Sequence, residues 1–340
     1  MRQAFIVSPV RTPVGTFGGA LRSVSAEELG ATVAQAVLQR SGVDPERIED
    51  VVLAGGVESM SNIEYYSTDM RWGKRSGSVR FHDRLERGRE RSQPEARFGY
   101  ISGMVETAEH LARDYGITRA EADAYAARSH QRAAAAWEGG RFDDEVVPLA
   151  VPQKKGEPFV FTRDEGIRAG TTVDTLAKLK PLMNDGTVTA GNASQQNDAA
   201  AACLIVAEDK LDELELAPLG YLAGWAAAGC EPSRMGIGPV PAVERLFART
   251  GFSFDRIDLV ELNEAFAAQV LAVLKGWQWN DPERLNVNGS GISLGHPIGA
   301  TGVRMLATLL HELRRRGARY GLEAMCIGGG QGMAAIFESA

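Results

Sequence analysis

Three short motifs in the C-terminal part of the chain carry side chains that could act together. They are Asn263-Glu264-Ala265-Phe266, then Gly295-His296-Pro297, then Cys326 with a run of glycines after it. Each is expected to follow a strand, and the ends of strands are where α/β folds collect their chemistry. An amide, an imidazole and a thiol offered from such ends could move protons and hold a carbonyl oxygen.

The segment after Cys326 reads Ile327-Gly328-Gly329-Gly330-Gln331-Gly332. Glycines leave backbone N–H groups uncovered, and such groups bind an oxyanion or an anionic ligand. A thiol beside them is a candidate nucleophile or acid/base. A buried, unreactive cysteine in a glycine turn fits the same residues, because cysteine is also a common core residue.

His296 and Asn263 each have a functional and an ordinary interpretation. His296 lies in a loop before a predicted helix, where it could hydrogen-bond a carbonyl oxygen, activate a thiol, or be a plain loop residue. Asn263 could hold a water in an oxyanion hole or cap the helix that starts near Ala265. The remaining histidines lie in polar or helical contexts and are expected at the surface: His82, His110, His130 and His311.

Composition bounds the kind of protein. The 340 residues suggest one large or two medium domains, and 24% charged residues are ordinary for a globular protein. A net charge of −7 argues against nucleic-acid binding. Three scattered cysteines form neither a disulfide framework nor a metal site, and the N-terminus has only a short apolar run. No apolar run approaches a membrane span, so a cytoplasmic location is the default expectation.

Nucleotide-binding patterns are weak. No GxxxxGK[ST] sequence occurs, and no GxGxxG follows an early strand. The stretch from Ile63 to about Tyr100 is rich in arginine and lacks a clear period, so we interpret it as an excursion outside the core sheet. Any one arginine there could meet a phosphate, although a charge-rich run is more often a solvated face.

The predicted elements alternate between strands and helices. Ala4–Val7 is expected to be a strand, and Ser25 with Glu28 forms a capping box for a helix that stops at Gly42. Further expected strands are 51–53, 221–228, 259–262 and 322–327, and further helices include those starting after Thr118, at 238–251 and at 266–275. The apolar run 199–206 fits helix or strand equally well.

An internal repeat indicates two related halves. The segment 36–56 parallels 245–265, since both read helix, glycine, acidic turn and strand. The second half alternates strands and helices throughout, whereas the first shows only strand, helix and strand before the basic excursion. Two strand–helix units are therefore expected to be absent near Asp50 and Val51.

NEAFA, GHPIGATG and CIGGGQGMA, in that order, resemble the thiolase family, as do VVLAGGVESMS, TVTAGNAS, MGIGPVPA and IVSPVRTPVG. The resemblance runs from Ala4 to Phe337. It implies an α/β fold of two similar βαβαβαββ halves in five layers with an inserted loop domain, the N-terminal half being shortened here. The corresponding boundaries are 1–60 with 181–216 for the N-terminal half, 61–180 for the loop domain and 217–340 for the C-terminal half.

The resemblance also implies roles for single residues. Cys326 would be the acid/base, His296 would activate the nucleophile and stabilise an oxyanion, Asn263 would position a water, and the N–H of Gly328 would serve a second oxyanion hole. The residues expected along coenzyme A are Ser194, Arg168, Met104, Ala265 and Phe266. Implied substrates are acyl-CoA and CoA, with no cofactor, metal, nucleic acid or membrane partner, in a homodimer or homotetramer of fatty acid metabolism.

One family feature has no counterpart in this sequence. The family places an acyl-carrying cysteine in a Cys-Gly-Ser-Gly turn before VVLAGG, whereas here Glu49-Asp50 runs straight into Val51. Cys203 lies in an alanine-rich core run and Cys230 in a variable loop. We therefore expect an acyl-CoA C-acyltransferase with impaired turnover; the alternatives are a non-catalytic acyl-CoA binder or assembly partner, and a chain that has lost a block.

Overall fold

The structure is a computed structural model that describes residues 3–340. The strands are β1 (Ala4–Arg11), β2 (Gly15–Thr16), β3 (Val51–Ser59), β4 (Tyr65–Tyr66), β5 (His82–Asp83), β6 (Leu149–Val151), β7 (Phe159–Phe161), β8 (Asn197–Ala207), β9 (Gly220–Gly229), β10 (Leu259–Leu262), β11 (Tyr320–Ile327) and β12 (Gln331–Ser339). The α-helices are α1 (Ala26–Ser41), α2 (Arg84–Glu90), α3 (Glu95–Phe98), α4 (Met104–Asp114), α5 (Arg119–Glu138), α6 (Val173–Ala177), α7 (Glu208–Leu211), α8 (Pro239–Thr250), α9 (Ala267–Trp277) and α10 (Thr301–Arg316). Short 3₁₀ turns are η1 (Pro45–Asp50), η2 (Met60–Asn62), η3 (Pro232–Ile237) and η4 (Phe254–Arg256).

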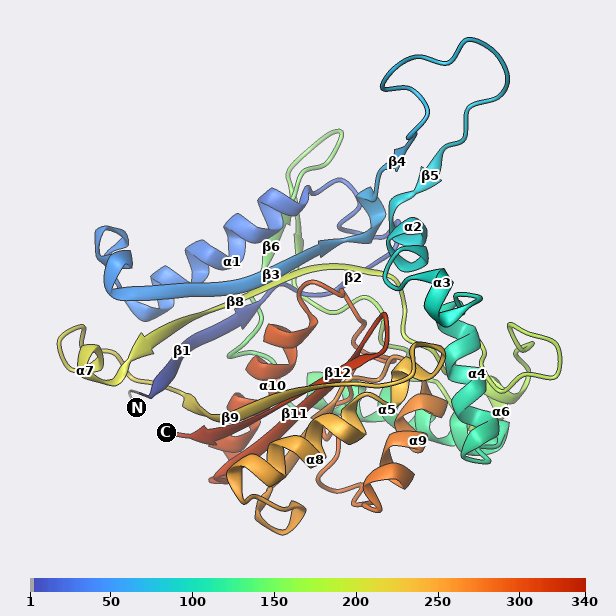
Figure 1. Ribbon diagram of the computed structural model, residues 1–340. Helices are drawn as coiled ribbons and strands as arrows, with labels where there is room; N and C mark the ends of the chain where they lie inside the picture. Colours follow the sequence, from blue (N-terminus) through green and yellow to red (C-terminus); the bar gives the residue numbers. More distant parts are fainter. Residues whose placement is uncertain (1–2) are drawn as a thin grey trace.

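The two halves stack in layers around α10 (Figure 1). One apolar cluster joins α1 to β1, β3 and β8, and a second joins α8 and α9 to β9–β12. A third cluster places α10 between these two groups of strands, through Leu306, Leu309, Leu310 and Leu313. The two groups of strands belong to one curled sheet, because β9 of the second half pairs with β1 of the first half. Helix, strands, helix, strands and helix then follow one another as the five-layered α/β arrangement that the family resemblance implies. The ambiguous run 199–206 is a strand, because it lies inside β8, which pairs on both sides.

The strands of each half follow the same pairing pattern. Strand β8 lies antiparallel between β1 and β3, and β12 lies antiparallel between β9 and β11. Strand β10 then extends the second half as a parallel neighbour of β11, with Leu262 opposite Ala324. β3 therefore occupies the position of β11 in its own half.

The sequence repeat is misleading at this point. It matches β3 with β10, yet β10 is parallel to its neighbour whereas β3 is antiparallel to its neighbour. In the second half, β10, α9, the segment 285–289 and α10 lie between α8 and β11. In the first half, α1 leads through η1 directly into β3.

The arginine-rich excursion has more structure than the sequence indicates. It contains the small β4–β5 ladder and the helices α2 and α3, and the loop between β4 and β5 projects away from the body (Figure 1). Its short elements escape periodicity analysis because none is long enough to show a repeating apolar face. The domain boundaries given above remain a prediction.

Helix α1 begins with the predicted capping box. The Ser25 hydroxyl accepts from the N–H of Glu28 at 3.2 Å, and the Glu28 carboxylate accepts from the N–H of Ser25 at 2.9 Å. We expect Ser25→Ala to lower the free energy of unfolding by about 1 kcal/mol, because a helix N–H loses its acceptor. Urea denaturation measures this, with Ser23→Ala as the control, since Ser23 is exposed and lies outside the helix. Equal effects of both changes would contradict the role of the cap.

Candidate functional site

The ends of β10 and β11 place Asn263 and Cys326 in one region. The two strands are parallel neighbours, and the N–H of Asn263 donates to the carbonyl of Ala324 at 3.0 Å. All four residues of β10 are buried, so this edge of the sheet is fixed by packing on both faces. Asn263 and Cys326 are therefore carried by rigid neighbouring elements and are offset by only one residue in the register of the two strands.

Asn263 contacts His296 directly. The Asn263 Nδ2 lies 3.3 Å from the His296 Nε2, although the residues are far apart in sequence. The interpretation of Asn263 as a helix cap is wrong, because α9 starts after Phe266 and has no side-chain cap. The Asn263 Oδ1 is buried and has no hydrogen-bond partner in the described part of the chain. It is therefore an acceptor available to a donor from a bound molecule.

The His296 ring is neutral and its proton is placed by Thr301. The Thr301 hydroxyl donates to the carbonyl of Pro297 at 2.7 Å, so it accepts from His296 Nδ1 at 2.8 Å. Burial lowers the pKa of His296 to about 4, with a smaller contribution from the charge of Arg304. The Nε2 then carries a lone pair beside Asn263. Because a hydroxyl both donates and accepts, rotation of Thr301 would move the ring proton to Nε2.

Cys326 lies in a small apolar cluster at the same strand ends. It packs with Met235 and Ala265, and Met104 and Phe266 lie against this cluster. Burial raises the pKa of its thiol to about 12. Cys326 therefore holds its proton at neutral pH, which suits an acid better than a free thiolate nucleophile.

A second thiol lies on the same side of this cluster. The Cys230 thiol donates to the carbonyl of Met235 across 3.7 Å, and the pKa of Cys326 is raised in part by the charge of Cys230. Burial raises the pKa of Cys230 itself to about 11. The variable loop that carries Cys230 thus approaches the candidate site, which its sequence context does not indicate.

Three of the expected coenzyme A contacts gather around Ala265. The N–H of Ser194 donates to the carbonyl of Ala265 at 2.9 Å, and Ala193 forms a β-bridge with Phe266. Met104, at the start of α4, packs against the same cluster as Cys326. The segments around 104, 194 and 265 are therefore adjacent, although they are widely separated in the sequence.

Gly328 and Arg168 do not belong to the cluster around Ala265 and Cys326. Gly328 is exposed in the turn between β11 and β12, two residues beyond Cys326. Arg168 is exposed on a loop, where its backbone N–H donates to His130 Nδ1 at 3.3 Å. His130 was expected at the surface and is instead 3% exposed; burial lowers its pKa to about 4. It lies on the inward face of α5, a distinction that helical spacing among alanines does not reveal.

Glu264 is a buried carboxylate beside the candidate site that the sequence analysis did not single out. Its buried carboxylate accepts from Tyr125 at 2.9 Å, Ser129 at 2.6 Å and Asn286 at 3.0 Å, and from the N–H of Ile292 at 3.2 Å. These contacts tie α5 and the segment before His296 to the end of β10. Its position beside Asn263 in the NEAF motif was the available signal.

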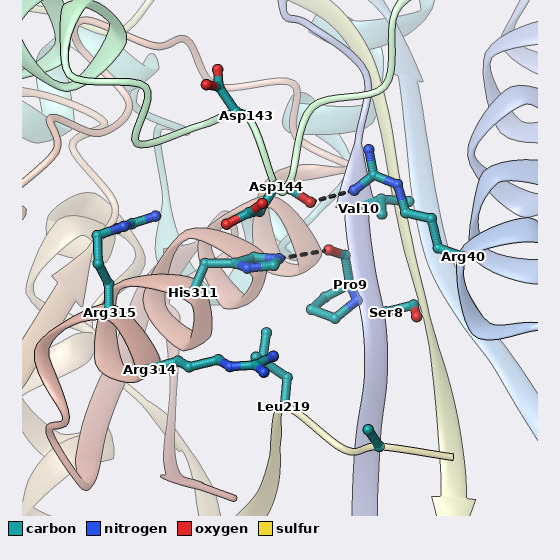
Figure 2. A pocket seen from close by; sticks show the side chains of 11 residues that line it. Ser8, Pro9, Val10, Arg40, Asp143, Asp144, Leu219, His311, Arg314 and Arg315 are labelled. Carbon is teal, nitrogen blue, oxygen red and sulfur yellow. Dashed lines mark hydrogen bonds between the residues drawn. The ribbon is translucent and has the colours of Figure 1, made fainter. Parts of the chain in front are cut away.

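A separate cavity lies elsewhere in the described part of the chain (Figure 2). It has a volume of about 750 Å³ and lies beside β1 and the end of α10. Its charged and titratable lining residues are of both signs: Arg40, Asp143, Asp144, His311, Arg314 and Arg315. His311 donates to the carbonyl of Pro9, so the ring is fixed to β1 (Figure 2). No residue of the three motifs lines this cavity.

Two negative findings apply to residues 3–340. Within that range no group of three or more His, Cys, Asp or Glu side chains could hold a metal ion. No helix in the same range is long and apolar enough to cross a membrane.

Fold and site together define an α/β protein of two related halves, with a neutral imidazole–amide pair and a protonated thiol at adjacent strand ends. The thiolase N-terminal domain family model matches residues 4–54 and 49–209, and the thiolase C-terminal domain model matches 216–339. The chain belongs to the thiolase family and, by this membership, is a thiolase-type acyltransferase.

Individual relatives agree over almost the whole chain. The acetyl-CoA acetyltransferase of Chromobacterium violaceum is 42% identical, with 98% of each chain covered. A crystal structure of the Bacillus anthracis acetyl-CoA acetyltransferase is 38% identical, with a TM-score of 0.93 and coverage of 100% of this chain and 99% of that one. Human mitochondrial 3-ketoacyl-CoA thiolase in complex with CoA is 36% identical, with a TM-score of 0.90, covering 100% of this chain and 98% of that chain.

The alignment with the Chromobacterium violaceum relative is longer than the chain. It spans 392 positions, 52 more than the 340 residues here, so at least 52 positions have no residue of this chain. The two matches of the N-terminal family model overlap at residues 49–54, where η1 leads into β3.

Proposed function

We propose that the chain binds an acyl-CoA thioester and acts on its carbonyl and α-carbon, the chemistry that underlies reversible Claisen condensation and thiolysis of a 3-ketoacyl-CoA. The observation that carries this is the contact of a neutral His296 with Asn263 beside the strand end that holds Cys326. The complex of human mitochondrial 3-ketoacyl-CoA thiolase with CoA supports coenzyme A as the substrate carrier.

The groups divide the work as follows. The thioester oxygen lies against Asn263 Nδ2 and, in the tautomer with the proton on Nε2, against His296. These donors stabilise the enolate that forms when an α-proton leaves. Cys326 takes that proton as its thiolate and returns it as a thiol. The Met104, Ser194, Ala265 and Phe266 segments line the approach of the pantetheine arm.

Acyl transfer through a covalent enzyme intermediate is impaired in this proposal. Cys203 lies inside β8, and burial raises the pKa of its thiol to about 12, so it is unsuited to carry an acyl group. We infer that the positions without a residue of this chain fall near 49–54, where the two family-model matches overlap, and that they would hold the acyl-carrying cysteine. In this proposal the chain therefore still transfers a proton at the α-carbon of the acyl-CoA but does not form an acyl-enzyme.

Replacing Cys326 with alanine is expected to reduce α-hydrogen exchange of acetyl-CoA in D₂O by at least about 100-fold, because the base is removed. Mass spectrometry of acetyl-CoA measures the exchange, and Cys203→Ala is the matched control. Since the thiol pKa is about 12, the wild-type rate should rise about tenfold per pH unit between pH 7 and 9. Exchange that survives in Cys326→Ala would overturn the assignment.

Intact mass after incubation with acetyl-CoA tests the impairment separately. We expect no acyl adduct on the protein and no thiolysis of acetoacetyl-CoA above background. An adduct on Cys230 would contradict the impairment, because this thiol lies beside the Cys326 cluster and would then supply the second sulfur. Binding of acetyl-CoA without exchange would instead favour a non-catalytic acyl-CoA binder.

A further inference from the structure

Strand β3 ends the first half of the sheet with an open edge. It pairs with β8 along its whole length, from Val51 opposite Val206 to Ser59 opposite Asp198. No strand within residues 3–340 pairs with its other side. Val52 is 61% exposed and Leu53 38% exposed, on the two faces of this edge. An exposed apolar edge is a template for pairing with another strand.

The other sheet edges are short or covered. Strand β2 is only two residues long. The outer side of β10 is bound by the following segment, since Val260 donates to the carbonyl of Arg284 at 2.8 Å and accepts from the N–H of Asn286 at 2.9 Å. The nine-residue β3 is longer than β2, and only its last part is contacted, where the backbone of Gly299 lies against Gly56 and Val57. The stretch from Val51 to Gly55 has neither protection, and it contains no charged residue to oppose pairing.

The second half of the chain shows what covers the equivalent edge. Strand β11, the counterpart of β3, is covered by β10 in parallel, and Leu322 of β11 is fully buried. The chain then continues through α9 and the 285–289 segment to α10, which packs between the two halves of the sheet. The first half has no such elements between α1 and β3. By this symmetry the occupant of the β3 edge is a parallel strand followed by a helix beside α10.

Relatives align over more positions than this chain has residues, and the N-terminal family model is interrupted at the start of β3. At least 52 aligned positions of the Chromobacterium violaceum relative have no residue here, and the family model is interrupted at 49–54, where β3 begins. A block of that length is long enough for a strand and helices that reach from β3 to α10.

We propose that the open edge of β3 binds a strand–helix segment of a second, thiolase-type polypeptide, whose strand runs parallel to β3 and whose helix enters beside α10. The inference rests on the proposed function in one respect: the segment would bring the acyl-carrying cysteine to His296 and Cys326. In that step the cysteine sulfur bonds the acyl carbon, the bond from that carbon to the coenzyme A sulfur breaks, and the thiol proton passes through His296 Nε2 to the departing coenzyme A thiolate.

A co-expressed fragment tests the docking. The probe is the part of the Chromobacterium violaceum relative that aligns between Asp50 and Val51, produced as a separate polypeptide with the full chain. Native mass spectrometry should find a one-to-one complex, and amide hydrogen exchange should slow along β3. Val52→Lys and Leu53→Lys should each weaken the complex at least tenfold. Val160→Lys, at an exposed position of β7, is the matched control and should leave it unchanged.

The outcomes separate docking from catalysis. No complex with a cooperatively folded chain would overturn the inference, as would equal binding by the lysine variants. Protection of β3 in the chain alone, in a dimer that Val52→Lys dissociates, would overturn it in favour of a second copy. A complex whose cysteine is not acylated by acetyl-CoA would leave the docking intact and count against the transfer step. The fragment with that cysteine changed to alanine should bind equally and stay unacylated.

Discussion

Replacing Asp164 with alanine is expected to lower the free energy of unfolding by about 3–5 kcal/mol, because it removes one of the two carboxylate partners of a buried arginine and leaves only Glu145. Arg11 is 1% exposed, and its two terminal nitrogens donate to the Asp164 carboxylate at 2.7 and 3.0 Å. Burial alone would lower the pKa of Arg11, but the charges of Asp164 and Glu145 outweigh burial and raise that pKa. The guanidinium therefore stays charged in the variant and cannot escape the cost by losing a proton.

The Asp164 carboxylate also ties the loop after β7 to the end of α5 and to the segment that follows β1. It accepts from the N–H of Val14 at 2.7 Å and from the Trp137 ring N–H at 3.0 Å. Denaturation by urea should show a lower midpoint for Asp164→Ala, with Asp143→Ala, at an exposed aspartate, as the control. Asp164→Asn keeps one acceptor and should fall between the two. A loss below about 1 kcal/mol in Asp164→Ala would mean that Arg11 finds a new partner.

Helix caps and the hairpin turn could be predicted from the sequence, because they depend only on interactions between nearby residues. Ser25 caps α1 and Gly42 ends it in a left-handed conformation, and Thr118 caps α5, as the residue types predict. The hairpin of β11 and β12 follows the same rule, since a glycine turn joins two apolar runs. These features depend on residues within a few positions of each other.

Long-range contacts were beyond the sequence. Arg11 and Asp164 are 153 positions apart, and nothing in either segment indicates the other. Asparagine is a common helix-capping residue, and only the fold shows that the Asn263 amide contacts His296 instead. The position of β3 is the sharpest case. Its approach through an acidic turn resembles that of β10, but its pairing with β8 is decided by strands elsewhere in the chain.

The sequence identified the candidate site residues but not the hydrogen bonds and packing that hold them in position. Its three motifs are recognisable because each must supply a particular functional group at a strand end. Their supports are less visible: Glu264 and Thr301 act through hydrogen bonds to distant segments or to ring atoms. A residue that positions another acts through its location in the fold, so its type alone does not identify it in the sequence.

Replacing His296 with alanine is expected to reduce α-hydrogen exchange of acetyl-CoA by about 100-fold or more, because the enolate loses a hydrogen-bond donor. His82→Ala, in the β4–β5 ladder, is the control. Both variants should keep cooperative melting, which separates the loss from unfolding.

The pH profile of this exchange distinguishes the neutral ring from a charged one. Since the folded His296 has a pKa of about 4, its imidazole is neutral throughout pH 5–9 and contributes no inflection there. The rate in that range should follow the Cys326 thiolate alone, with a constant upward slope. An inflection near 6.5 that disappears in His296→Ala would mean that the ring titrates normally and that the enolate is held by an imidazolium. The absence of that inflection, together with the loss in His296→Ala, would identify the neutral ring as the reactive form, with Thr301 setting which nitrogen bears the proton.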